Sequence, residues 1–305
     1  MGVADVPQWL LPAYVQSMSH AGATASREQL RDMGTNLITL WSTPDRAFHN
    51  LRHLIDLLTR VDELSEETRN PDLVRLAAWY HGAIFSVSAD QAMHRNGGED
   101  EAASAALAYE ELTAAGVSEK NANRVSELIM NLRRHDLPTS DIDAAALSDA
   151  DLGCLAIEPQ RYREYSRLIY SEYAHLPLLT YLRTRTTIVR KLLARDRLFA
   201  SPLGQHWELP ARENLEAELR RLSSKLSILE ADNDAVVDFD RFVTPASAPS
   251  PESVALSAAS AASVAGTAPV AGSLATTSST PATAPATGGS ATVAEAELES
   301  EPYVP

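Results

Sequence analysis

The amino-acid sequence predicts an all-α fold of about eight or nine helices, followed by a disordered tail. Ala, Leu, Glu and Arg dominate the first 240 residues, and glycine occurs only 13 times in the whole chain of 305 residues. This composition favours helices. Apolar residues recur at helical spacing, and no segment shows the alternating pattern of a strand. An apolar content of 45% is sufficient for a core.

Caps and apolar spacing predict the helices of the first half. Ser26 and Gln29 form a capping box ahead of a periodic apolar run. Pro71 suits a first helical turn that follows Asn70 as cap. Gly116 is suited to end the fourth helix. The expected helices cover approximately residues 26–40, 49–61, 71–84, 99–115 and 118–132.

Three more helices are expected in the second half of the helical region. Two cover about residues 160–173 and 177–195, and the last follows Pro210, with leucines at helical spacing. No repeat of fixed period is present. Residues 1–244 are therefore expected to form one helical domain.

The composition changes sharply near Val243. Residues 245–305 consist almost entirely of Ala, Ser, Thr, Pro, Gly and Val, with five glutamates and no Lys or Arg. Such a segment has too few large apolar groups to offset the entropy of ordering it, so we expect a disordered tail. The tail is either a linker or docking segment, with Glu301–Pro305 as a short recognition motif, or a solubilising extension. Its glutamates are Glu252, Glu295, Glu297, Glu299 and Glu301.

Charge and cysteine content restrict the class of protein. The formal net charge of -15 and the pI near 4.9 argue against a basic nucleic-acid-binding surface. The single cysteine, Cys154, excludes an internal disulfide and fits a reducing compartment. The N-terminus has no signal-peptide pattern, and no apolar run approaches the roughly 18–20 residues of a membrane span. A soluble cytoplasmic protein without membrane contact is expected.

Histidines and acidic residues stand at spacings that suit a metal site. His49 and His53 are four residues apart, which places both on one face of a helix. His81 ends a strongly apolar helix, where an imidazole needs a partner or a cavity. Together with the later acidic pair Asp149 and Asp151, they offer imidazole and carboxylate ligands. The alternative is that these histidines are hydrogen-bonded core residues.

Other site types lack support in the sequence. It contains no phosphate-binding loop, no glycine-rich dinucleotide turn and no nucleophile elbow. Cys154 is expected to be buried and inert. The basic segment Arg183–Arg197 is expected to be a solvated helix face, with an anion or nucleic-acid contact as the alternative.

An ordered set of motifs resembles one family. The opening motif is Pro44-x-Arg46-x-Phe48-His49-Asn50-x-x-His53, followed by Trp79-Tyr80-His81, Glu101-x-x-Ser104-Ala105, Leu128-Ile129 with His135, and Asp149-Ala150-Asp151-Leu152. Further matching residues are Tyr162, Tyr165, Glu172, Tyr173, Leu198, Phe199, Glu208, Ala211, Arg212, Asn214 and Leu215. Residues 24–222 thereby resemble the HD superfamily, specifically a bacterial group of predicted metal-dependent phosphohydrolases.

The resemblance implies an HD-type helical bundle that hydrolyses a nucleotide or another small phosphoester. It implies that His53, His81 and Asp151 bind a divalent ion: Mn, Mg, Fe, Zn or Ni. His49 and His135 would lie near the site, and Asp149 would either replace Asp151 as a ligand or cap a helix that starts there. The implied catalytic residues are Arg46, as a phosphate ligand or else a surface or capping arginine, and Glu101, as a base or else a helix N-terminal carboxylate.

Two departures from the family pattern leave a second function open. Gly82 stands where the family has an aspartate that helps to hold the metal, and Tyr170 stands where it usually has arginine. Water, Asp90 or Asp100 could compensate for the missing carboxylate. The first hypothesis is a phosphohydrolase with a reduced metal site. The alternative is a catalytically degenerate protein that binds a ligand or a protein partner, with a purely structural domain as the third.

Overall fold

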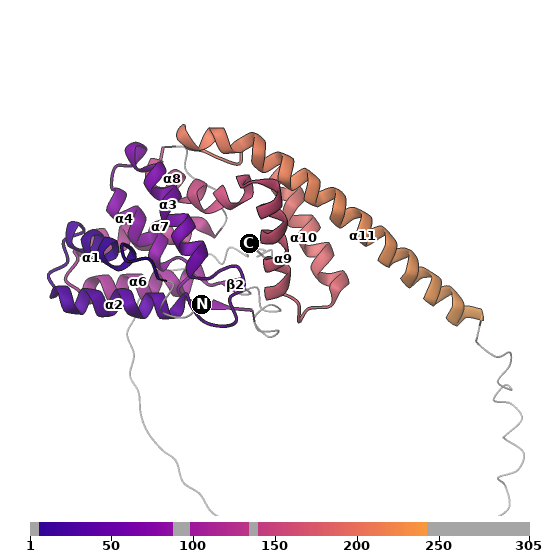
Figure 1. Ribbon diagram of the computed structural model, residues 1–305, viewed down its shortest axis with the longest axis horizontal. Helices are drawn as coiled ribbons and strands as arrows, with labels where there is room; N and C mark the ends of the chain where they lie inside the picture. The colour runs from indigo at the N-terminus through magenta and orange to yellow at the C-terminus, as the bar shows by residue number, and fades with distance from the viewer. Residues whose placement is uncertain (1–5, 88–97, 134–139, 243–305) are drawn as a thin grey trace, which may run out of the picture. The chain divides into compact units, whose positions relative to one another are not determined.

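The computed structural model confirms the all-α class. It describes residues 6–87, 98–133 and 140–242, with side chains as far as residue 231. This part contains ten α-helices and one ribbon of two very short antiparallel strands, β1 (Phe85–Ser86) and β2 (Gly98–Glu99). The helices are α1 (Leu10–His20), α2 (Arg27–Leu40), α3 (Leu51–Glu63), α4 (Pro71–Tyr80), α6 (Glu101–Ala114), α7 (Glu119–Leu132), α8 (Ile142–Leu152), α9 (Pro159–Glu172), α10 (Leu178–Leu193) and α11 (Glu208–Phe242) (Figure 1).

The chain divides into two units. One compact unit holds residues 1–234, and a second comprises residues 235–300. All contacts described below lie within the first unit. The predicted boundary at residue 244, and the tail that follows it, fall outside the described residues.

Local signals set the helix ends where they were expected. Ser26 and Gln29 form both hydrogen bonds of the capping box at the start of α2. Ser118 caps α7 through the backbone N–H of residue 121. Gly116 has a φ of 86°, a left-handed conformation that glycine adopts without strain after a helix ends.

Two helices and the strand pair differ from expectation. α1 precedes the first predicted helix. α8 ends at Leu152, although a helix was expected to begin near Asp149, because Asp141 caps it earlier by accepting a hydrogen bond from the Ala144 N–H. The strand pair is too short to produce an alternating pattern, so it could not be predicted from periodicity.

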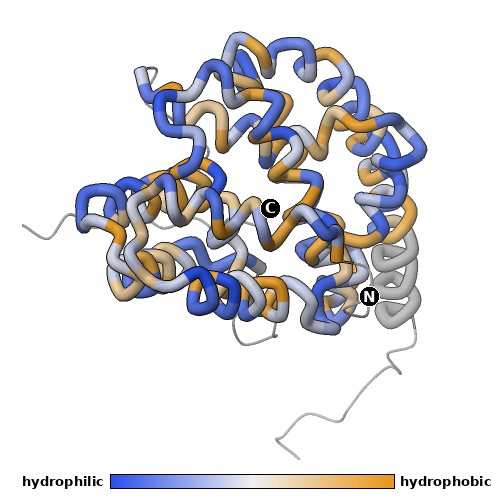
Figure 2. Tube along the Cα trace, turned by 60° about the vertical axis from the view of Figure 1, so that its left-hand side comes forward, coloured by the Kyte–Doolittle hydropathy of each residue, from blue (hydrophilic) through white to orange (hydrophobic). Residues whose placement is uncertain are grey.

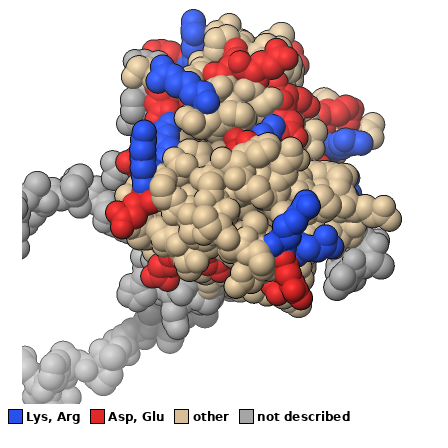
Figure 3. Space-filling view, turned by 90° about the vertical axis from the view of Figure 1, so that its left-hand side faces the viewer, with Lys and Arg blue, Asp and Glu red and all other residues tan. Residues whose placement is uncertain are grey.

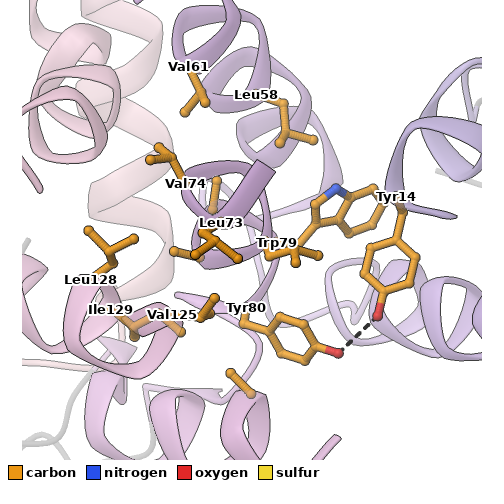
Figure 4. Packing of buried hydrophobic residues seen from close by; sticks show 14 of the residues in the cluster. Tyr14, Leu58, Val61, Leu73, Val74, Trp79, Tyr80, Val125, Leu128 and Ile129 are labelled. Atoms are coloured by element: carbon orange, nitrogen blue, oxygen red, sulfur yellow. Dashed lines mark hydrogen bonds between the residues drawn. The ribbon is translucent and has the colours of Figure 1, made fainter. Parts of the chain in front are cut away.

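One hydrophobic core is formed by helices α1, α2, α3, α4, α6, α7 and α8. Its largest buried side chains include Trp41, Trp79 and Tyr80. Tyr14 from α1 packs edge-on against Trp79 of α4. Its hydroxyl lies 2.9 Å from that of Tyr80 (Figure 4). The Tyr80 hydroxyl donates a hydrogen bond to Glu111 of α6. Partnered hydroxyls let these large rings be buried without an unmet polar group.

A second core brings together α9, α10 and the first part of α11. The carboxylate of Glu218 on α11 accepts two hydrogen bonds from the Arg185 guanidinium of α10, at 2.8 and 3.1 Å. The Tyr162 hydroxyl of α9 donates a third to the same carboxylate. All three side chains are buried, so this network links three helices inside an otherwise apolar cluster.

The surface pattern follows from this burial. Hydrophilic and hydrophobic stretches alternate along the helices, as amphipathic helices around a core require (Figure 2). On the face shown in Figure 3, acidic and basic side chains intermingle around a wide uncharged centre. No helix in the described ranges is both long and apolar enough to cross a membrane.

Candidate metal centre

Three side chains from separate elements bring ligand atoms together. The Nε2 atoms of His53 and His81 and a carboxylate oxygen of Glu99 all lie within 4.8 Å of one another. Each of these atoms is buried, and none has a hydrogen-bond partner among the described residues. Leaving one such atom unpaired costs about 1–3 kcal/mol. Three of them facing one point form a group that could hold a metal ion.

Asp151 lies against the same group. Its Oδ1 is 3.6 Å from the His53 Nε2 and 3.9 Å from the His81 Nε2, while the Glu99 Oε1 is 3.4 Å from the His81 Nε2. Metal–ligand bonds of about 2.0–2.1 Å place the atoms of a tetrahedral site about 3.3 Å apart. These three separations exceed that value, and Asp151 lies outside the group whose ligand atoms are all within 4.8 Å of one another, so its carboxylate would have to move to become a fourth ligand.

The ends of two helices position the imidazoles of His53 and His81. Asn50 caps α3 by accepting hydrogen bonds from the backbone N–H groups of Arg52 and His53, so His53 sits in the first turn. His81 directly follows α4, and its Nδ1 lies 2.7 Å from the Ala78 carbonyl oxygen. A carbonyl can only accept, so Nδ1 carries a proton, and Nε2 is the nitrogen that faces the cluster.

Burial also keeps His53 suited to metal binding. It lowers the pKa of His53, and the neighbouring Asp151 only partly opposes this effect. The imidazole is therefore neutral near pH 7, which is the form that binds metals.

Glu99 occupies the space that a side chain at position 82 would need. The ribbon pairs Phe85 with Glu99, which carries the Glu99 carboxylate to the end of α4. A Cβ built on Gly82 would overlap that carboxylate and the Trp41 ring. The Trp41 ring has little freedom to move away because its Nε1 donates a hydrogen bond to the Trp79 carbonyl. Gly82 is thus the residue that makes room for a carboxylate arriving from position 99.

His49 forms a buried ion pair beside the cluster. Its Nδ1 lies 2.7 Å from one oxygen of Glu172, and the other oxygen accepts the backbone N–H groups of Phe48 and His49. Burial opposes the charged imidazolium, but the Glu172 carboxylate outweighs it and raises the pKa of His49 to about 9. His49 is therefore a cation at neutral pH and lacks the lone pair that a metal ligand needs.

The His49 pair predicts a pH dependence of stability. Its raised pKa means that the folded protein holds this proton more tightly than the unfolded chain, whose histidine titrates near 6.5. The stabilisation is complete below about pH 6.5 and is lost as the pH rises through about 9. In chelator, the gap in unfolding free energy between wild type and His49→Gln should shrink over this range in urea titrations. A constant gap would contradict the charged state.

Arg46 is held by groups of the protein itself, and its contact with phosphate stays a prediction. Its guanidinium donates to the carbonyls of His49, Gly82 and Ala83, at 3.0, 2.8 and 3.0 Å, and to the Thr43 hydroxyl. These bonds use most of its donors. Arg46 therefore ties the segment before α3 to the end of α4, beside both histidine ligands.

The remaining predicted residues lie around the centre or away from it. Asp149 accepts hydrogen bonds from the backbone N–H groups of Ala200 and Ser201, so it neither joins the cluster nor caps a helix there. Glu101 begins α6, where burial and the nearby Glu99 raise its pKa to about 7. His135 and Asp90 lie outside the described residues. Asp100 caps α6 through the Ala103 N–H.

A cleft of about 60 Å³ opens beside the cluster. His49, His53, Glu99 and Asp151 line one side of it. Its other side is mostly apolar and comes from the segment after α8 and from α9 and α10. Those residues are Leu152, Cys154, Leu155, Tyr165, Arg185, Ile188, Leu192 and Arg195. Tyr170 does not line this cleft.

Sequence reasoning missed Glu99 as the compensating carboxylate. The loop after Gly82 was the right place to look, but Asp90 and Asp100 were considered instead. Gly98, with a φ of 93°, supplies a turn that side-chain-bearing residues rarely adopt, and Glu99 follows it directly. Comparisons of the chain with family models, curated proteins and solved structures gave no match.

Proposed function

We propose that this protein is a metal-dependent phosphohydrolase of the HD type, acting on a small phosphoester. The observation that carries the proposal is the convergence of three buried ligand atoms that have no partner among the described residues. Two imidazole nitrogens and a carboxylate oxygen that face one another in a buried site are a donor set that a bound cation would satisfy.

The donor set restricts the ion. Two imidazole nitrogens favour Zn, Fe or Ni, and two carboxylates extend the range to Mn. Both nitrogens come from neutral imidazoles in this proposal, so the carboxylates of Glu99 and Asp151 balance the charge of a divalent ion. When bound, such an ion polarises a phosphoryl oxygen and lowers the pKa of water.

The chain's own residues would receive the phosphate. His49 is a cation held in place by Glu172, and it lines the cleft beside the metal ligands. Its Nδ1 is taken by Glu172, which leaves Nε2–H to donate a charge-assisted hydrogen bond to a phosphate oxygen. The small volume of the cleft favours a phosphoester whose phosphoryl group enters while the remainder stays outside.

Metal content is the first test of this proposal. Full-length protein loaded separately with Mn²⁺, Fe²⁺, Ni²⁺ or Zn²⁺ and then desalted should retain about one ion per chain by elemental analysis. His81→Ala should retain almost none, since it removes one of the converging nitrogens. His175→Ala is the matched control because His175 is exposed and far from the cluster in sequence. Equal retention by both variants would refute the site.

Hydrolysis distinguishes the enzyme from its alternative. Metal-loaded protein should release phosphate from p-nitrophenyl phosphate or from a nucleoside monophosphate, and Asp151→Asn should abolish the release. Metal retention without turnover of any phosphoester would favour the second hypothesis, a catalytically degenerate protein that binds a ligand or partner through the same pocket.

A further inference from the structure

A groove of about 600 Å³ runs along α9, α10 and α11 and shares no lining residue with the metal cleft. Its volume falls in the usual range of binding pockets, about 300–1,000 Å³. Three of the large hydrophobic side chains that are most exposed in the described chain line it: Tyr170, Leu178 and Ile228. Leu182 and Leu222 extend the apolar floor. Exposed apolar groups gathered in a concave surface indicate a site for another molecule.

Contacts between the helices fix their directions along this groove. Asn214 of α11 donates a hydrogen bond to the Ile157 carbonyl, just before α9 begins. Four residues later, Glu218 accepts a hydrogen bond from Tyr162 in the first turn of α9. α9 and α11 therefore run in the same direction. α10 runs the opposite way, because only residues 173–177 separate it from α9.

Positive charge lines the part of the groove nearer to Glu218. The four cations are Arg163 and Arg167 of α9 and Arg221 and Lys225 of α11. Glu218 is the only acidic residue among those that line the groove, and its two oxygens accept hydrogen bonds from Arg185 and Tyr162. On the outer surface, Arg167 also pairs with Glu164. The charge of this part of the groove therefore suits an anion.

The exposed apolar side chains lie toward the other end. Ile228 is ten residues beyond Glu218, which is about 15 Å along α11. Tyr170 lies in the last turn of α9 and packs edge-on against Tyr181 of α10. Leu178 is the first residue of α10, so it lies at the same end. The groove thus has a cationic half and an apolar half, arranged end to end.

We propose that the groove binds a single-chain anionic amphiphile, a molecule with one alkyl chain and a carboxylate or phosphate head. Arginine binds either head through its planar fork of N–H donors, and the alkyl chain would cover the exposed apolar side chains. An amphipathic helix of a partner suits the groove less well, because its charged and apolar groups lie on opposite sides along its whole length. This proposal does not depend on the metal centre.

Titration calorimetry with the full-length protein tests the proposal, in chelator and below the critical micelle concentration. Octanoate, decanoate and dodecanoate should each bind at about one molecule per chain, with an affinity that rises about fourfold for every added CH₂ group. Dodecyl phosphate should displace dodecanoate. Dodecyltrimethylammonium, which has the same alkyl chain and a cationic head, should not.

Reversal of charge tests the contacts with the head. Arg163→Glu with Lys225→Glu should weaken the binding of dodecanoate by more than about tenfold, because hydrogen bonds to charged groups are lost. Arg27→Glu with Arg31→Glu makes the same change in charge on the exposed face of α2 and should leave the affinity unchanged.

A second pair of variants tests the contacts with the alkyl chain. Ile228→Ser should weaken the binding of dodecanoate about fivefold, because it removes part of the apolar surface that the chain covers. Leu209→Ser is the matched control, since Leu209 is a comparably exposed residue of α11 that does not line the groove. Far-UV circular dichroism of each variant verifies that the helices are retained.

Several outcomes would overturn the proposal. They are the absence of binding by every amphiphile, an affinity that ignores chain length, displacement by the cationic amphiphile, and binding that survives the charge reversal in the groove. A dimer in sedimentation velocity that the reversal dissociates would assign the groove to a second copy of the chain. Binding to phosphatidylglycerol vesicles without binding of monomeric dodecanoate would assign it to a membrane surface. Either assignment would replace the proposal.

Discussion

Replacing Glu99 by Ala should weaken metal binding by more than about 100-fold, because even residues outside the ligand set change affinity by about 10–100-fold. Glu99 supplies one of the converging ligand atoms and part of the negative charge that balances a divalent ion. Titration calorimetry of Zn²⁺ or Mn²⁺ into metal-free protein measures the loss. Glu119→Ala, which removes an exposed carboxylate at the start of α7, is the matched control.

The same experiment extends to position 82. Gly82→Asp alone should not improve binding, because its Cβ would overlap the Glu99 carboxylate and the Trp41 ring. Adding Gly82→Asp to Glu99→Ala frees part of that space and returns a carboxylate, so the double variant should bind metal more tightly than Glu99→Ala. If Gly82→Asp alone strengthens binding and Glu99→Ala has no effect, Glu99 is not the compensating ligand.

Breaking the buried pair of Arg185 and Glu218 should have the largest effect on stability. Arg185→Met leaves the Glu218 carboxylate buried without its cation, which typically costs about 3–5 kcal/mol. Urea unfolding of the variant should show this loss. The exposed pair of Arg183 and Glu230 joins the same two helices, so Arg183→Met should cost only about 0–1 kcal/mol.

A double substitution separates stranded charge from lost packing. Arg185→Met with Glu218→Leu replaces the pair by apolar groups and should recover most of the stability. Failure to recover would show that the geometry of the network, including Tyr162, is what stabilises the three helices. The pKa of Glu218 is lowered in the folded protein, so the pair's contribution to stability depends on pH. The pair stabilises the fold above the ordinary carboxyl pKa, and this stabilisation is lost as the pH falls through the lowered value.

Local signals were sufficient for most of the fold. Capping residues such as Ser26 and Ser118 act within one turn, and apolar periodicity reports which face of a helix is buried. The meeting of His53, His81 and Asp151 followed from the resemblance, and the structure places their side chains together. Whether they bind metal remains a prediction.

The remaining features depend on contacts between distant segments. Arg46 occupies a motif position that suggests phosphate binding, yet its guanidinium donates hydrogen bonds to three backbone carbonyls. Asp149 resembles a ligand or a cap, yet the backbone at Ala200 and Ser201 holds it. The hydrogen-bond partners of Arg46 and Asp149 cannot be inferred from sequence spacing, because they depend on how distant segments of the chain pack together.

The overlap between a side chain at position 82 and the Glu99 carboxylate constrains which substitutions this site tolerates. A step that restores a side chain at position 82 while Glu99 remains creates a collision, and a step that removes Glu99 first leaves the histidines without this carboxylate. The two positions therefore depend on each other, because a Cβ at position 82 and the present Glu99 carboxylate cannot occupy the same space. A search pattern that demands an acidic residue directly after the histidine would pass over any chain in which the carboxylate reaches the same place from position 99.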